Sequence, residues 1–168
     1  MPDRRLFLDI FRLYQLTGAV VERQVRELGI PAYLLGLLAQ IHRLEPVTPS
    51  VISMRTGIAT TTLRDNIQRL VDRELIERTP NPGDGRSYLI ELTDKGKRLL
   101  QAADPALLEA YLALDRRLPR ASAEYEQRLA ELDAALAGML TDPAWQALAD
   151  GSPRGKDRAH RARRRRRV

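Results

Sequence analysis

The sequence contains no cysteine, and this absence removes several kinds of chemistry at once. A disulfide scaffold, a zinc site built on thiolates and redox sensing through cysteine are all excluded. Histidine occurs only twice, and no second ligand stands four residues from His42, so we expect no metal site. There is no glycine-rich phosphate loop, and the carboxylates alternate with Arg and Lys along helix surfaces. We therefore expect neither an enzyme nor a bound cofactor.

Long apolar runs are also absent. No stretch is long enough to cross a membrane, and the start lacks the charged-then-apolar pattern of a secretion signal, so we expect no membrane partner. A chain of 168 residues fits one domain, or a small binding domain with an interaction region.

Positive charge is concentrated at the end of the chain. The whole sequence has 28 Lys and Arg against 22 Asp and Glu, a net charge of +6. From Arg154 onward there are nine basic residues and one acidic residue, whereas residues 1–153 carry a net charge of −2. The stretch from Thr48 to Leu92 contains six Arg and six acidic residues. The average charge of that stretch therefore gives no support for nucleic-acid binding. Whether it can bind nucleic acid depends on where each charged residue lies.

The stretch from Thr48 to Gly96 has the most informative pattern. Thr48-Pro49-Ser50 is typical of a helix start, because a hydroxyl group can accept a free N–H and proline suits the first helical position. Gly57 ends this short helix. The next helix opens at Thr60, Thr61 or Thr62 and buries one apolar stripe, formed by Leu63, Ile67, Leu70 and Val71.

Two strand-like segments follow this helix. Residues 75–79 and 87–92 alternate in polarity, and residues 80–85 between them contain two prolines and two glycines, a strong turn signal. Helix, turn, helix and β-hairpin make a winged helix-turn-helix, whose second helix has the size to enter a DNA major groove. We predict a mainly α-helical fold with a small β-hairpin wing, in which residues 31–92 are the DNA-binding domain.

Helical patterns flank this domain on both sides. A helix is expected over residues 3–28, then a break at Gly29-Ile30-Pro31 and a core helix over residues 32–44. Thr93 should cap a helix that is kinked at Asp104 or divided there, and two more helices should begin at Ser122 and near Pro143. The first helix has an apolar face too wide for one partner helix, so it is buried within its own domain or also packs on a second subunit. We assign residues 1–30 and 93–150 to a helical dimerisation region and residues 151–168 to a disordered Arg-rich tail.

Four motifs together resemble those of the MarR family of bacterial transcription regulators. They are Thr48-Pro49-Ser50, the run from Ile58 to Ile76, Asp84-Gly85-Arg86, and Leu92-Thr93-Asp94-Lys95-Gly96. The resemblance implies a homodimer held by long flanking helices that binds double-stranded DNA at a pseudo-palindromic operator, as a repressor in the cytoplasm, associated with the nucleoid. One departure stands out, because Glu74 occupies the place where relatives usually have a helix-ending glycine. The exit of the helix must differ or accept strain.

Placing Leu63 toward the core sorts the residues of the second helix. The candidates for reading bases are Thr60, Thr61, Thr62, Arg64, Asp65 and Gln68, because each has a suitable chemistry: Arg64 for guanine, Gln68 for adenine, Asp65 for the cytosine amino group and a threonine methyl for thymine. Arg69 and Arg73 are expected to hold phosphates. Alternatively, Asp65 and Asp72 only solvate an exposed face, with Asp65 paired to Arg69.

The resemblance also assigns roles outside this helix. In the family the acid of the wing fixes the arginine that reaches the minor groove, which here would be Asp84 and Arg86. The alternative is an ordinary surface salt bridge. Many members respond to small aromatic ligands in a cleft beside the dimerising helices, for which this chain offers Arg12, Tyr14, Tyr33 and Tyr111, together with Phe11. The alternative is that Phe11 and Tyr14 are core residues.

Three functions remain open from the sequence. The first is a ligand-responsive repressor with one preferred DNA sequence. The second is an architectural DNA-binding protein driven by the basic tail, in which the segment from Arg161 to Arg167 resembles a nonspecific phosphate-binding arm. The third is a protein-interaction module that has lost DNA reading, which the uncharged winged-helix stretch would fit.

Overall fold

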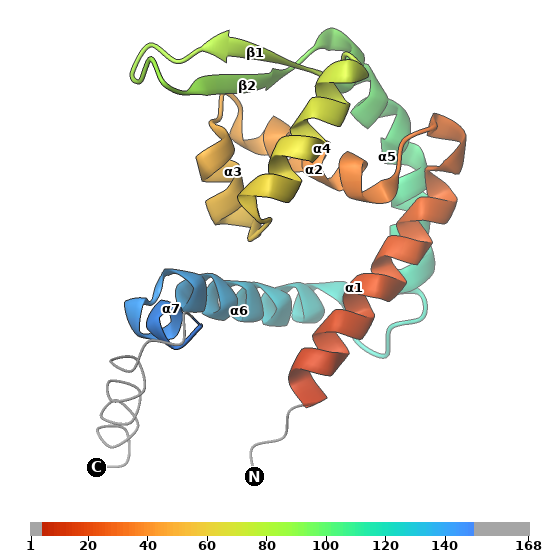
Figure 1. The fold of residues 1–168 in the computed structure, drawn as a ribbon. Helices are drawn as coiled ribbons and strands as arrows, with labels where there is room; N and C mark the ends of the chain where they lie inside the picture. Colours follow the sequence, from red (N-terminus) through yellow and green to blue (C-terminus); the bar gives the residue numbers. More distant parts are fainter. Residues whose placement is uncertain (1–4, 150–168) are drawn as a thin grey trace. The chain divides into compact units, whose positions relative to one another are not determined.

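The computed structural model describes residues 5–149, which are mainly helical with one two-stranded antiparallel sheet (Figure 1). This confirms the predicted fold class. In chain order the elements are α1 (Arg5–Gln24), the 3-10 helix η1 (Arg26–Leu28), α2 (Ala32–Leu44), α3 (Pro49–Thr56), α4 (Thr60–Asp72), β1 (Ile76–Pro80), β2 (Tyr88–Leu92), α5 (Asp94–Asp115), α6 (Ser122–Thr141) and α7 (Pro143–Ala149). The predicted Arg-rich tail lies outside the described residues.

The chain divides into two compact units, Met1–Leu118 and Pro119–Val168. The core of the first unit lies under the winged helix and is built around α2, which buries Leu34, Leu35, Leu37, Leu38 and Ile41. Helix α4 and the two strands add apolar side chains to the same cluster. Each large aliphatic side chain buried in this way stabilises the fold by about 1.5–3 kcal/mol. The prediction that residues 32–44 form a core helix is confirmed.

Hydroxyl caps and glycines set the helix ends where the sequence predicted them. The Thr48 Oγ1 accepts the backbone N–H of Val51 at 3.4 Å, and Gly57 ends α3 with a left-handed φ of 69°. Thr93 caps α5 by accepting the N–H of Gly96 at 3.1 Å. Helix α4 begins at Thr60, one of the predicted positions.

The exit of α4 is strained, as the sequence led us to expect. Glu74 has a φ of 58°, in the left-handed region that favours glycine. Its carbonyl oxygen accepts a hydrogen bond from the Thr93 hydroxyl at 2.7 Å, and its carboxylate pairs with the Lys95 ammonium at 2.8 Å. The hydrogen bond that Lys95 donates to the Glu74 carboxylate lowers the pKa of this carboxyl group, and the positive charge of Lys95 lowers it further. Gly96 permits this close approach, because a Cβ there would overlap the Leu75 carbonyl oxygen.

Two long helices differ from the predicted patterns. The first α-helix ends at Gln24 and does not continue to residue 28, because Val25 turns into the core, where it is fully buried, and a 3-10 turn follows. Helix α5 is a single helix that continues through Pro105, which settles the alternative of two successive helices. The proline removes one N–H donor, and Gln101, four residues earlier, is exposed, so water can bind its carbonyl group.

Two of the long helices, α1 in the first unit and α6 in the second, have no fully buried side chain. Phe11 and Tyr14 of α1 are 61% and 68% exposed, so the alternative that they belong to the core of this chain is wrong. In the second unit, α6 packs against α7, and Leu129, Leu140 and Trp145 remain exposed. None of the helices described between residues 5 and 149 is long and apolar enough to cross a membrane.

Candidate nucleic-acid interface

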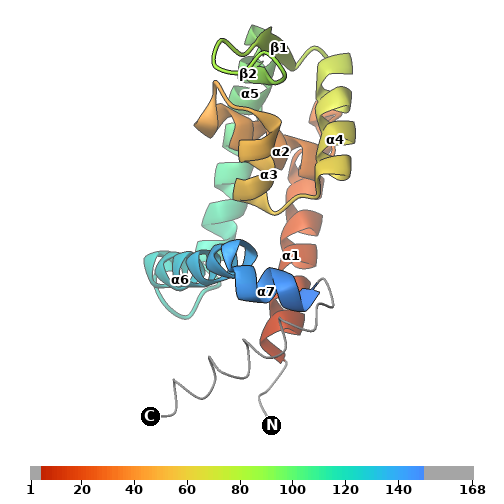
Figure 2. The same cartoon turned by 60° about the vertical axis from the view of Figure 1, so that its left-hand side comes forward.

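Helix α4 lies on the outside of the first unit (Figure 2). The polar residues opposite its buried stripe are exposed. It buries Leu63, Ile67 and Leu70 against the core, which is the stripe that the sequence predicted, and Val71 is half-buried. Asn66 is also buried. Every residue predicted to contact DNA from this helix is exposed: Thr60, Thr61, Thr62, Arg64, Asp65, Gln68, Arg69 and Arg73.

The exposed side chains in the N-terminal half of α4 form no hydrogen bond or ion pair with the described part of the chain. Within residues 5–149, no hydrogen bond or ion pair engages the side chains of Thr60, Thr61, Thr62, Arg64 or Asp65. The alternative pairing of Asp65 with Arg69 is therefore wrong for this structure. The N-terminal part of a recognition helix contacts base edges in the major groove, and the hydrogen-bond donors, acceptors and methyl groups of these five side chains lie in that part of α4.

The C-terminal half of the same face is engaged by protein. The Gln68 amide donates to Asp72 Oδ1 at 2.7 Å and accepts from Arg78 Nη2 at 3.0 Å. Arg69 donates to the Tyr33 hydroxyl at 2.7 Å, and Arg73 donates to the Gly29 carbonyl at 2.8 Å. Base reading by Gln68 and phosphate binding by the two arginines stay predictions, which would require these bonds to be shared or exchanged.

Arg78 is a residue of this surface that the sequence analysis missed. It stands on β1 opposite the buried Ile90, so both side chains are on the side of the sheet that faces the core. Its guanidinium lies 5.0 Å from the centre of the Tyr88 ring, a cation–π contact, and reaches Gln68 on α4. The signal was present in the alternation of the strand, because Arg78 follows the buried Ile76 by two positions.

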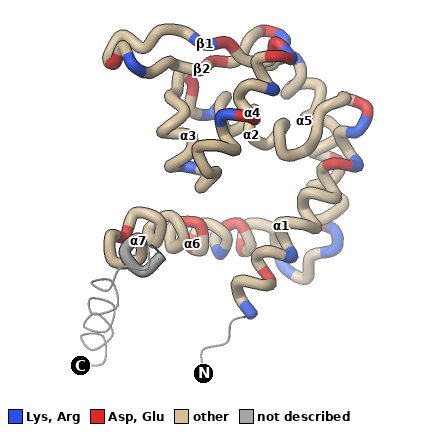
Figure 3. The backbone as a smooth tube through the Cα atoms, viewed as in Figure 1, with Lys and Arg blue, Asp and Glu red and all other residues tan. Residues whose placement is uncertain are grey.

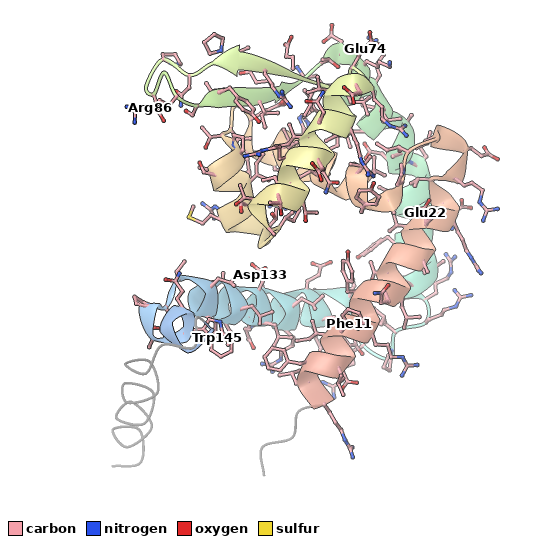
Figure 4. The ribbon with its side chains drawn as sticks, viewed as in Figure 1. Phe11, Glu22, Glu74, Arg86, Asp133 and Trp145 are labelled. Carbon is pink, nitrogen blue, oxygen red and sulfur yellow. The ribbon has the colours of Figure 1, made fainter. Side chains whose placement is uncertain are left out.

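The wing has a different geometry from the one that the resemblance implied. Asp84 Oδ1 accepts the backbone N–H of Arg86 at 3.0 Å, so the acid shapes the turn and does not hold the guanidinium. No ion pair joins these two side chains among the described residues, which also rules out the alternative of a surface salt bridge. Asn81 closes the base of the turn through Ser87 and Gly83. The Arg86 side chain projects from the tip of the wing (Figure 4), where its charge is available to a minor groove.

Charges of both signs are spread over α4 and the wing (Figure 3). This distribution agrees with the equal numbers of Arg and acidic residues between Thr48 and Leu92. Within this stretch, the exposed arginines without a hydrogen bond or ion pair among the described residues are Arg55, Arg64 and Arg86. Any attraction of this stretch to a phosphate backbone would rest on these three side chains.

The four residues predicted to line a ligand pocket come from three helices. Arg12 and Tyr14 lie on the exposed side of α1, Tyr33 on the first turn of α2, and Tyr111 on α5. A cavity of about 550 Å³ lies elsewhere, between the base of the sheet and the start of α5, and none of the four residues lines it. The ligand pocket therefore stays a prediction. His42 pairs with Glu45 at 2.7 Å, and residues 5–149 contain no group of three or more side chains placed to hold a metal ion.

Comparison with known proteins finds similarity to one family. Residues 29–87 match the model of the MarR family. The chain is 29% identical over 94 residues to the HTH-type transcriptional repressor NicR of Pseudomonas putida, an alignment that covers 56% of this chain and 60% of that repressor. Among solved structures, it is similar to a mutant of MarR from E. coli complexed with operator DNA, with 23% identity, a TM-score of 0.69 and coverage of 77% of this chain and 94% of that one. It is also similar to the transcriptional regulator MOSR of M. tuberculosis in complex with DNA, with 25% identity, a TM-score of 0.67 and coverage of 78% and 95%.

Proposed function

We propose that this chain, whose residues 29–87 match the model of the MarR family, is a homodimeric regulator of transcription. It binds double-stranded DNA at a pseudo-palindromic operator and represses the adjacent genes, and it works by binding and not by catalysis. Its place of action is the bacterial chromosome in the cytoplasm. The proteins it resembles include a repressor and regulators in complex with DNA, which supports this assignment.

The observation that carries the proposal is the free N-terminal half of α4. Its side chains are exposed and have no partner within the described residues, so they are available to base edges. Arg64 can donate two hydrogen bonds to guanine, and Asp65 can accept from the cytosine amino group. Arg86 at the tip of the wing supplies a charge suited to the minor groove. These groups together give both sequence reading and register.

The apolar face of α1 supports the homodimer. Its large side chains include Leu6, Phe7, Phe11, Leu13 and Leu16, each more than half exposed. A contiguous apolar surface of this kind marks a protein–protein interface. A two-fold axis through such an interface would present two copies of α4 to successive major grooves, about one DNA turn apart.

Selection of bound sequences from a random DNA pool tests the proposal directly. The regulator predicts inverted half-sites about 10 base pairs apart, with each mismatch costing roughly 1–3 kcal/mol. Arg64→Gln should relax the preference at one position of each half-site. Arg98→Gln, which removes the same charge from the exposed surface of α5, is the matched control and should leave the consensus unchanged. Recovery of random sequences by the full chain would contradict the proposal.

The charge distribution favours one further candidate, an architectural DNA-binding protein. The stretch from Thr48 to Leu92 has no net charge, whereas nine basic residues stand between Arg154 and the end of the sequence. A protein that bound through those residues would show little sequence preference and strong salt dependence. Repeating the selection with a chain that ends at Pro153 separates the two candidates. A regulator keeps its consensus with weaker affinity, and an architectural protein loses binding altogether.

A further inference from the structure

The junction between α1 and α2 is held by helix α4. Arg73 Nη1 donates to the Gly29 carbonyl at 2.8 Å, and Arg69 Nη1 donates to the Tyr33 hydroxyl at 2.7 Å. Gly29 ends the 3-10 turn after α1, and Tyr33 stands on the first turn of α2. Arg69 on α4 and Arg73, the residue that directly follows this helix, therefore hold both sides of the point where the chain changes direction. We call these two contacts the arginine clasp.

A third hydrogen bond extends this connection to α1. Glu22, near the end of α1 (Figure 4), accepts the backbone N–H of Ala32 on its carboxylate at 2.6 Å. That N–H lies at the start of α2, where helix donors have no partner within the helix. The start of α2 is thus tied to α1 on one side and to α4 on the other. Gly29, with a φ of 65°, gives the backbone between them a conformation that other residues rarely adopt.

The clasp uses one edge of α4 and leaves the centre of its exposed face free. Arg69 and Arg73 are four positions apart and share one edge, whereas Gln68 faces the opposite edge and contacts β1 through Arg78. Thr61 and Asp65, between the two edges, have no partner among the described residues. The division separates side chains that can reach DNA from side chains that hold α4 in place.

We propose that Arg69 and Arg73 are positioning residues, which set the angle between α1 and α4 through the clasp and do not neutralise DNA phosphates. The inference rests on the proposed function, in which α1 contributes to the dimer interface and α4 reads DNA. Any change in the angle between these helices is then applied twice, once in each subunit, and alters the spacing of the two α4 copies. Tyr33, the acceptor for Arg69, is a positioning residue for the same reason.

Salt dependence of DNA binding distinguishes a positioning arginine from a phosphate contact. Each lost phosphate contact lowers the slope of log K against log salt concentration by about one. A chain that ends at Pro153, which lacks the nine basic residues expected to bind phosphates, should show a lower slope. Arg69→Gln and Arg73→Gln should each weaken DNA binding about 3- to 10-fold, because each removes one hydrogen bond that positions α4. The salt-dependence slope of both variants should equal that of the wild type. A slope lowered by about one in either of these two variants would overturn the proposal.

Tyr33→Phe tests the clasp without removing any charge or ring. It deletes only the hydroxyl group that accepts from Arg69. DNA affinity should fall by the same factor as in Arg69→Gln, and the double variant should bind no more weakly than either single variant. Tyr33→Phe binding as tightly as wild type, or factors that multiply in the double variant, would contradict the proposal. Circular dichroism of each variant shows that the fold is intact.

A distance measurement within one subunit tests the positioning role in the absence of DNA, whether or not the chain forms a dimer. Because the chain has no cysteine, Gln15→Cys on α1 and Thr61→Cys on α4 introduce two unique spin-label sites. Diluting the labelled protein with unlabelled chain restricts the signal to distances within one subunit. The distribution should broaden or shift when Arg73→Gln or Tyr33→Phe is added, and an unchanged distribution in both would overturn the clasp. A shifted distribution in a protein that selects no DNA would leave the clasp standing and refute only the proposed function.

Discussion

Helices α1 and α2 are both rich in apolar residues, yet they differ in how far these residues are buried. Helix α2 buries five large side chains in the core of the first unit, whereas α1 buries none. The difference lies in their neighbours, because α2 packs against α1, α4, α5 and β2, whereas α1 packs mainly against α2, α5 and the 3-10 turn that follows it. An apolar face therefore identifies a surface that must be covered but does not identify what covers it.

The largest effect is expected where the apolar surface is covered within the chain. Leu38 is fully buried in α2, so Leu38→Ala should lower the free energy of unfolding by about 2–5 kcal/mol, because it leaves a cavity that the packed core cannot fill. Urea denaturation followed by circular dichroism measures the change. Met54→Ala is the matched control, since Met54 is exposed on α3 and its truncation should cost less than about 0.5 kcal/mol.

A different outcome is expected where the apolar surface is uncovered. Phe11→Ala should leave the core of the chain intact and weaken the proposed homodimer by about 2 kcal/mol or more, as truncation of a central interface aromatic does. Sedimentation analysis over a range of protein concentrations measures this loss. Gln15→Ala, an exposed polar position one turn further along α1, should leave the dimer unchanged. If Phe11→Ala sediments as wild type does, another surface forms the dimer.

The contrast also explains how far the sequence could predict the structure. Local signals were sufficient for α2, for the caps at Thr48 and Thr93 and for the buried stripe of α4, because hydroxyl groups, glycines and helical spacing act within a few residues. The end of α1 was not predictable in this way. Val25 leaves the helix because the core offers it a buried position, and that position is created by segments distant in the sequence.

The same distinction between local and distant causes applies to the candidate DNA-binding surface. Exposure of the residues on α4 followed from the position of Leu63 alone, and the structure confirms it. The partners of Arg69 and Arg73 are 36 and 44 positions away, so no local pattern could reveal that protein atoms already engage these arginines. The contact that Asp84 makes was not predicted either. Its carboxylate accepts the backbone N–H of Arg86 and does not pair with the guanidinium group of the same residue. Whether the exposed residues bind DNA stays a prediction that the selection experiment tests.

A smaller effect is expected at Glu74, where backbone strain and a surface contact oppose each other. Its left-handed φ costs about 1–2 kcal/mol relative to glycine. The ion pair with Lys95 is exposed on both sides, so solvent screening leaves it a small contribution. Glu74→Gly should therefore stabilise the chain by about 1 kcal/mol in thermal unfolding. Glu74→Ala, which loses the ion pair but keeps the strain, is the control and should destabilise it.

The smallest effect is the pH dependence of that ion pair. Lys95 lowers the pKa of the Glu74 carboxyl group, so the folded state binds a proton there less readily than the unfolded chain. The pair therefore stabilises the fold at neutral pH, and this contribution disappears as the pH falls through the lowered pKa. The difference in unfolding midpoint between wild type and Glu74→Gln should shrink to zero in acid and should also diminish in high salt, because both groups are exposed. A difference that persists at acidic pH would assign the contribution to the hydrogen bond and not to charge.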